Sequence, residues 1–134
     1  MTAEALKDFA TRYTAAWCSQ DAARVASFYA PTGSITINGG TPAMGRAGVT
    51  AAAQSFMTTF PDLVVQMDGL EQRGGDKAVF RWTATGTNSG PGGNGNKVRF
   101  SGREEWTLGA DGLIAASLGY FDEADYQRQM TARA

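Results

Sequence analysis

A single glutamate occupies a position where the pattern of a buried strand calls for an apolar side chain. Residues 97–108 alternate polar and apolar side chains, which is typical of a half-buried β-strand. Side chains on a strand point alternately to its two faces, so Glu104 shares a face with Phe100 and Trp106. A carboxyl group between two apolar rings must be paired, protonated or turned towards a wet cavity. Glu104 is therefore the first candidate for acid–base chemistry.

The residue types that are missing limit what other chemistry is possible. The sequence contains no histidine and one cysteine, which excludes Ser–His and Cys–His nucleophile pairs, a Cys–His metal cluster and an intrachain disulfide. Cys18 lies beside Trp17 in an apolar helix pattern, where nothing would stabilise a thiolate, so we assign it no role. Proton transfer is left to Asp, Glu, Tyr, Lys or Cys side chains, and we expect neither a metal site nor a cofactor.

Tyr13 and Asp122 are the other two candidates, and each has a structural alternative. Tyr13 falls on the apolar stripe of the first predicted helix, where ordinary core packing is the alternative, although a buried hydroxyl still needs a partner. Asp122 follows the last predicted strand and directly precedes a predicted short helix. It can act as a base, or as a helix N-cap whose side chain accepts backbone N–H bonds, which lowers a carboxylate pKa.

The direction of Arg81 determines the expected state of Glu104. Alternation over residues 77–87 places Arg81 with Val79 and Thr83 on one face of a strand, and the opposite face is more apolar. If Arg81 points inward, it pairs with Glu104 and keeps it ionised. If it points outward, Glu104 is free to be a neutral acid beside Tyr13. The sequence is compatible with both interpretations.

The elements that must position these side chains are helices first and strands afterwards. Apolar spacings of three and four predict a helix over residues 2–19, a short helix from Asp21 that ends at Pro31, and a third helix over residues 47–60. Residues 34–37 followed by Asn-Gly-Gly predict a strand and a short hairpin. Strands over residues 63–73, 77–87, 97–108 and 113–121 predict an antiparallel meander, and a last short helix begins at Asp122. This order is typical of an α+β domain, with three N-terminal helices packed on a curved, mostly antiparallel sheet.

Length and composition indicate an ordinary globular domain. The chain has 134 residues and a net charge of −1, which fits a single domain over residues 1–134 without attraction to nucleic acid or an anionic membrane. No apolar run approaches the roughly 18 residues of a membrane span, and the first residues, with Glu4 and Asp8 around Lys7, lack the order of a signal peptide. We expect a cytoplasmic protein without nucleic-acid or membrane partners.

Five short motifs follow the predicted elements in order. They are FYAP at residues 28–31, GRAGV at 45–49, FPD at 60–62, RWTATGT at 81–87 and DGLI at 111–114. Together with the element order, they resemble the nuclear transport factor 2-like superfamily, and within it the SnoaL-like polyketide cyclase branch. The resemblance covers nearly the whole chain and implies a cone-shaped α+β fold. It is less specific for activity, because the superfamily mixes enzymes with binding and scaffold proteins.

The resemblance implies catalytic roles for the three candidates. In the polyketide cyclases an aspartate just beyond the last strand is the general base, which matches Asp122, and their histidine on the preceding strand aligns near Glu104. In the ketosteroid isomerases a tyrosine on the first helix and a protonated carboxylic acid on a strand form the oxyanion hole, which matches Tyr13 and Glu104. The base of those isomerases falls at Ile37 or Asn38, neither of which accepts a proton.

A third pattern, that of limonene epoxide hydrolase, matches less of the sequence. It has Arg-x-Asp on a central strand and an aspartate at the end of the last strand. Asp122 fits the latter, but residues 81–83 read Arg-Trp-Thr and lack the middle aspartate. Epoxide hydrolysis would then need a water held between Asp122 and Glu104.

Two functions of different classes follow from these observations. The first is a cofactor-independent isomerase or aldol-type cyclase for a small, apolar, carbonyl-bearing molecule, in which Asp122 moves the proton and Tyr13 with Glu104 stabilises the oxyanion. The second is a non-catalytic small-molecule-binding or structural dimeric module, which a closed cone without a cavity of roughly 300 Å³ would favour. If Phe80, Trp82 and Phe121 cover the outer face of the sheet, that apolar surface predicts a homodimer. The expected substrate-contacting residues are Trp17, Tyr29, Arg81, Phe100, Trp106 and Tyr120.

Overall fold

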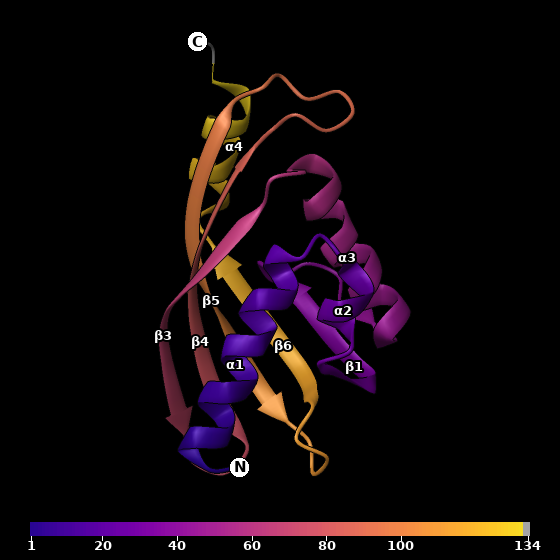
Figure 1. Ribbon diagram of the computed structural model, residues 1–134, viewed down its shortest axis with the longest axis vertical. Coiled ribbons are helices and arrows are strands. Elements are labelled where there is room, and N and C mark those ends of the chain that lie inside the picture. The colour runs from indigo at the N-terminus through magenta and orange to yellow at the C-terminus, as the bar shows by residue number, and fades with distance from the viewer. Residues whose placement is uncertain (133–134) are drawn as a thin grey trace.

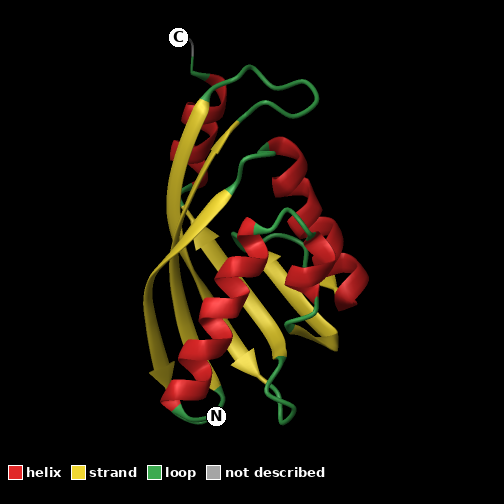
Figure 2. Ribbon diagram, in the orientation of Figure 1, coloured by secondary structure: helices red, strands yellow, loops and turns green. Residues whose placement is uncertain are grey.

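The computed structural model describes residues 1–132 and has helices on one side of a curved sheet (Figures 1 and 2). Helices α1, α2 and α3 cover this side, and α4 lies beside β5 near the C-terminal end. This arrangement confirms the predicted α+β fold. The helices are α1 (Ala3–Cys18), α2 (Ala22–Ala26), α3 (Gly45–Thr59) and α4 (Glu123–Thr131), and the strands are β1 (Tyr29–Ile37), β2 (Ala43–Met44), β3 (Val64–Arg73), β4 (Lys77–Thr87), β5 (Lys97–Leu108) and β6 (Ile114–Phe121).

The sheet combines the predicted meander with one pairing that local patterns do not reveal. Its strand order is β2-β1-β6-β5-β4-β3, and the run from β3 to β6 is antiparallel throughout. Strand β1 joins the meander by parallel pairing with β6, with Ile35 opposite Ser117. This pairing brings the first half of the chain against the last strand, so that side chains from both ends of the sequence meet at one place.

The second helix is shorter than predicted, because the chain turns into the sheet earlier. Helix α2 ends at Ala26, and Tyr29 and Pro31, which the sequence assigned to the helix and its end, lie in β1. The Ile114 backbone N–H donates to the Phe28 carbonyl at 3.0 Å, which starts the pairing of β1 with β6. Tertiary pairing therefore overrides the local helical spacing here.

An aromatic cluster fills the space between α1 and the sheet. Tyr13 of α1 packs edge-on against Trp106 of β5 with ring centroids 5.2 Å apart, and Trp106 stacks on Phe80 of β4 at 5.1 Å. All three rings are almost completely buried. The first helix is thus fixed on β4 and β5 at the point where Glu104 lies. None of the helices in the described part of the chain is long and apolar enough to cross a membrane.

Candidate functional site

Glu104 is buried inside the molecule, where one of its carboxyl oxygens accepts several hydrogen bonds. Only 6 % of its surface is exposed. Its Oε1 accepts from Tyr13 Oη at 2.9 Å, Trp106 Nε1 at 3.0 Å and Ser117 Oγ at 2.7 Å, and Tyr29 Oη lies at 3.4 Å. Tyr29 Oη is also 2.9 Å from Tyr13 Oη, so its single proton serves either acceptor. The carboxyl group is therefore paired with neutral donors and not with a cation.

Four separate elements bring these donors together. Tyr13 comes from α1, Tyr29 from the start of β1, Trp106 from β5 itself and Ser117 from β6. The parallel pairing of β1 with β6 is what places Tyr29 and Ser117 on the same side of Glu104. The structure thus unites the predicted residues Tyr13, Tyr29, Glu104 and Trp106 in one network, and it adds Ser117, which the sequence reasoning did not identify.

The environment of this network affects the pKa of each acidic group in it. Burial raises the pKa of Glu104 above its usual value, and the hydrogen bonds, which favour the charged form, offset that effect only in part. Burial, together with the nearby Glu104 charge, raises the pKa of both Tyr13 and Tyr29 well above the usual value. The two tyrosines therefore keep their protons and remain donors to Glu104.

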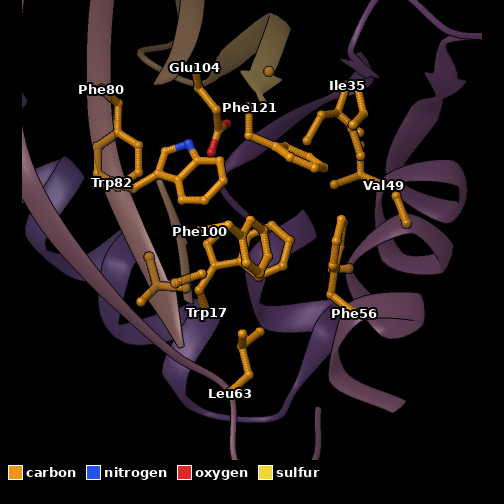
Figure 3. Close-up of a pocket in the computed structure, with 16 residues that line it drawn as sticks. Trp17, Ile35, Val49, Phe56, Leu63, Phe80, Trp82, Phe100, Glu104 and Phe121 are labelled. Carbon is orange, nitrogen blue, oxygen red and sulfur yellow. The ribbon is translucent and has the colours of Figure 1, made fainter. Parts of the chain in front are cut away.

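Glu104 also lines an almost wholly apolar cavity between the helices and the sheet, with a volume of about 60 Å³. Figure 3 shows its carboxyl group between the rings of Trp82 and Phe121. Among the lining residues in the described part of the chain, Glu104 is the one with an ionisable side chain. The largest of the other lining side chains are those of Trp17, Phe56, Phe80, Trp82, Phe100 and Phe121.

The second carboxyl oxygen of Glu104, Oε2, is the one without a hydrogen-bond partner among the described residues. It accepts no hydrogen bond from the described residues, whereas Oε1 faces donors from Tyr13, Trp106 and Ser117. An oxygen that already accepts these bonds cannot also carry the carboxyl proton without displacing a donor. When Glu104 is protonated, the proton therefore resides on Oε2, and when it is ionised, Oε2 is the oxygen that can accept a proton.

Arg81 points away from the cavity, so the ion pair with Glu104 is not formed. Its Nη2 lies 2.9 Å from Glu71 Oε1, and its Nε lies 3.1 Å from the same oxygen, in a half-exposed pair on the outer face of the sheet. The alternation in β4 that grouped Arg81 with Val79 and Thr83 describes this outer face. Of the two interpretations of Glu104, the structure agrees with the one in which Arg81 faces outward.

Asp122 lies outside the cavity, at the start of α4. It is the N-cap of that helix, and its Oδ1 accepts the Asp125 backbone N–H at 3.0 Å. It is exposed and lines a groove of mixed polarity with Arg103 and Tyr120, whose ring lies 4.5 Å from the Arg103 guanidinium carbon. Trp82 and Phe121 line both this groove and the cavity. The structure therefore does not bring Asp122 or Tyr120 into contact with the network around Glu104.

Three aromatic residues face inward, contrary to one expectation from the sequence. Phe80, Trp82 and Phe121 were considered as a cover for the outer face of the sheet, but all three line the cavity. The outer face instead carries ion pairs such as Arg103–Glu105, with Nε and Oε2 2.9 Å apart. These three residues therefore do not form the outward aromatic surface expected for a homodimer, and the homodimer itself stays a prediction.

Among the predicted substrate-contacting residues, only Trp17 and Phe100 line the cavity. Tyr29 and Trp106 contact Glu104 Oε1 through their hydroxyl and indole N–H groups, and neither residue lines the cavity. The sequence reasoning did not assign most of the other lining residues to the cavity, and Trp82 is one of them, although the apolar alternation of β4 already grouped it with Phe80. Within residues 1–132, no three His, Cys, Asp or Glu side chains are grouped in a way that could hold a metal ion.

Comparisons with known structures agree with this architecture. TsrD from Streptomyces laurentii superposes with a TM-score of 0.83 at 23% identity, covering 99% of both chains. A hypothetical protein with a ketosteroid isomerase-like fold from Catenulispora acidiphila, in complex with trimethylamine, gives 0.79 at 14% identity over 92% of both chains. A candidate SnoaL-like polyketide cyclase from a Jannaschia species gives 0.77 at 19% identity over 95% of this chain and 94% of that one. At these identities the likeness concerns the fold.

The sequence itself carries the family assignment. A search of curated proteins finds no match. The model of the SnoaL-like domain, in contrast, matches residues 10–117, a range that includes Tyr13, Glu104 and Ser117. The chain therefore belongs to the SnoaL-like domain family.

Proposed function

We propose that the protein binds a small, largely apolar, carbonyl-bearing molecule in the cavity and acts on it as an acid–base enzyme, with Glu104 as the proton carrier. The observation that carries this proposal is the unequal use of the Glu104 carboxyl group: neutral donors surround Oε1, and Oε2 is left for a molecule in the cavity. A buried carboxylate with a raised pKa is a stronger base than an exposed one.

One carboxylate is sufficient for an isomerisation. Oε2 of ionised Glu104 takes a proton from the carbon next to the carbonyl, the C–H electron pair forms a carbon–carbon double bond, and the carbonyl electron pair moves to oxygen. In a substrate that has a carbon–carbon double bond on the far side of that carbon, the proton then returns from Oε2 to the distant end of this double bond, the oxygen electron pair re-forms the carbonyl, and the double bond ends next to the carbonyl carbon. Tyr13 acts here as a positioning residue, because its hydroxyl donates to Oε1 and fixes the orientation of the carboxyl group.

This proposal changes the roles that the family resemblance implied. The general base is Glu104 and not Asp122, because Asp122 caps α4 outside the cavity. The proposed isomerase or cyclase chemistry is otherwise the one expected from the sequence. The geometry does not support epoxide hydrolysis, since that reaction needs Asp122 and Glu104 to share a water and Asp122 lies outside the cavity.

The alternative, a non-catalytic binding or structural module, is favoured by one specific observation. The cavity volume of about 60 Å³ is well below the roughly 300 Å³ expected of a catalyst's ligand pocket. Catalysis on a larger molecule therefore requires the aromatic walls to move apart.

Hydrogen–deuterium exchange of a simple ketone tests the proposal without knowledge of the natural substrate. Cyclopentanone is incubated with the protein in D₂O, and loss of the protons next to its carbonyl is followed by NMR. We expect the wild type to accelerate this exchange over buffer, and Glu104→Gln to reduce the acceleration at least about a hundredfold, as removal of a general base does. Glutamine can still accept hydrogen bonds at the position of Oε1, so this variant should fold.

The matched control is Glu105→Gln, because Glu105 neighbours Glu104 but points to the outer face, where it pairs with Arg103. This variant should accelerate the deuterium exchange of cyclopentanone as much as the wild type does. Binding of cyclopentanone without accelerated exchange would support the non-catalytic alternative. Equal acceleration by wild type and Glu104→Gln would refute the role of Glu104.

A further inference from the structure

The indole N–H of Trp82 is a buried donor without a partner. Trp82 lies on the inner face of β4 and lines the same cavity as Glu104. Its Nε1 is buried, and among the described residues it has no hydrogen-bond partner. The large majority of buried side-chain polar atoms in proteins are hydrogen-bonded, so such a group calls for an explanation. In the wall of a cavity, the missing acceptor can be supplied by a molecule that binds there.

A glycine allows this ring to lie against β5 close to Glu104. Trp82 is opposite Gly102 in the pairing of β4 with β5, and a Cβ atom on Gly102 would lie only 2.8 Å from Trp82 Cζ2. Cζ2 is on the same edge of the indole as Nε1. Gly102 is also the neighbour of Glu104 on the inner face of β5, since side chains on a strand alternate. In Figure 3 the indole nitrogen is on the side of the ring nearest the Glu104 carboxyl group.

The protein itself does not satisfy this donor with Glu104. Oε1 already accepts from Tyr13, Trp106 and Ser117, and no hydrogen bond joins Trp82 Nε1 to either carboxyl oxygen. Trp17, the other tryptophan in the cavity wall, has no buried unpaired N–H. Two residues that line the same cavity therefore carry an unused donor and an unused carboxyl oxygen.

We propose that Trp82 Nε1–H binds the carbonyl oxygen of the substrate, with the adjacent carbon placed against Glu104 Oε2. This inference rests on the proposed function, and it narrows the substrate to a small neutral ketone or aldehyde with a hydrogen on the carbon next to the carbonyl. When that proton passes to Oε2, negative charge develops on the carbonyl oxygen, where the indole N–H stabilises it. Trp82 takes the place expected for Tyr13, whose hydroxyl is engaged by Glu104.

NMR of the three indole N–H signals tests this contact directly. The protein labelled with nitrogen-15 is titrated with cyclopentanone and with methylenecyclopentane, which has a similar shape but no oxygen. Trp82→Phe identifies the Trp82 signal by its loss. We expect the ketone to move the Trp82 signal downfield and the alkene to leave it nearly unshifted. The ketone should also bind about fivefold more tightly than the alkene, as one neutral hydrogen bond allows.

Variants separate this hydrogen bond from general effects on the cavity. Trp82→Phe should remove the preference for the ketone over the alkene while binding of the alkene persists. Trp17→Phe makes the same change of ring elsewhere in the cavity wall. This variant should keep the preference for the ketone over the alkene, even if it binds both compounds more weakly. Persistence of the ketone preference in Trp82→Phe would overturn the proposal.

The remaining outcomes distinguish this inference from the proposed function. Equal binding of ketone and alkene by the wild type would refute the contact with Trp82, while accelerated deuterium exchange by Glu104 would still support the proposed function. Tighter binding of cyclopentylammonium than of either neutral compound would overturn the inference, because the wall would then select a cation through its carboxylate and aromatic rings. Binding of none of the three compounds would count against both proposals.

Discussion

Glu104 combines two demands that usually conflict in a protein interior. A buried carboxyl group must be hydrogen-bonded to be tolerated, and Tyr13, Trp106 and Ser117 meet this demand at Oε1. The proposed exchange of a proton with a ligand also needs one oxygen without a partner, and Oε2 accepts no hydrogen bond from the described residues. The carboxyl group is thus hydrogen-bonded at Oε1 and unpaired at Oε2.

The raised pKa of Glu104 predicts a particular dependence of stability on pH. The unfolded chain releases the Glu104 proton near its ordinary pKa of 4.5, whereas the folded protein holds it to a higher pH. Between the two pKa values unfolding releases a proton, so the free energy of unfolding falls with rising pH, by about 1.4 kcal/mol per pH unit from this group.

Glu104→Gln provides the reference for this measurement, because it cannot titrate. The difference in free energy of unfolding, wild type minus variant, is measured by urea denaturation from pH 4 to pH 8 and should fall above about pH 4.5. A difference that rises with pH instead would show that the hydrogen bonds to Oε1 outweigh the effect of burial.

At the scale of the elements, the strands that carry the site were more predictable than the segments around them. Strands β4 and β5 occupy the predicted residues, because alternation over a long half-buried strand is a strong local signal. The end of α2 and the pairing of β1 were not predictable in this way, since they depend on contacts with β6 far along the chain. Arg81 was ambiguous because its partner, Glu71, lies on another strand.

The candidate site could be only partly predicted from the sequence, because some of its residues meet only through pairing between distant strands. Glu104 is recognisable because it interrupts the apolar positions of one strand pattern. Tyr13 is recognisable because it falls on the apolar stripe of the first helix. Ser117 and the unpaired N–H of Trp82 become apparent only when neighbouring strands are in register. The resemblance to known families assigned Asp122 to the site by its position in the chain, but the start of α4 holds its side chain outside the cavity.

The cap of α4 gives a prediction at this scale. Asp122→Ala removes the acceptor for the Asp125 backbone N–H and should lower the free energy of unfolding by about 1 kcal/mol, while Asp122→Asn, an equally good cap, should change it little. Urea denaturation measures both effects.

The same two variants also test where the base lies. Asp122→Asn removes a carboxylate but preserves the cap, and we expect it to retain the cyclopentanone exchange of the wild type. Loss of exchange in a variant that is as stable as the wild type would return the role of base to Asp122.

At the scale of the whole molecule, Glu104 is a point where the first helix, the first strand and the last two strands are joined. Replacement by leucine should therefore destabilise the entire fold, because Trp106 and Ser117 would lose their buried acceptor and Tyr13 would keep only Tyr29. We expect a loss of about 3 kcal/mol or more in the free energy of unfolding, at about 1–3 kcal/mol per orphaned buried group.

Urea denaturation followed by circular dichroism checks this expectation, with Glu104→Gln as the isosteric comparison. Glutamine keeps the acceptor and should retain most of the stability. If leucine and glutamine were equally tolerated, the hydrogen bonds to Oε1 would not contribute to stability, and the orientation of the carboxyl group would lack the support described above.

The parallel pairing of β1 with β6 has a consequence for the order in which the protein folds. During synthesis β1 emerges long before β6, and until β6 arrives its one neighbour in the sheet is the two-residue strand β2. Closing so long a loop is slow, and an unpaired strand edge is prone to association with other chains. Ser117 arrives with β6, so the ring of donors around Glu104 closes only when β6 docks. A nascent chain would therefore build the meander of β3 to β5 first and acquire its acidic centre in the last step of folding.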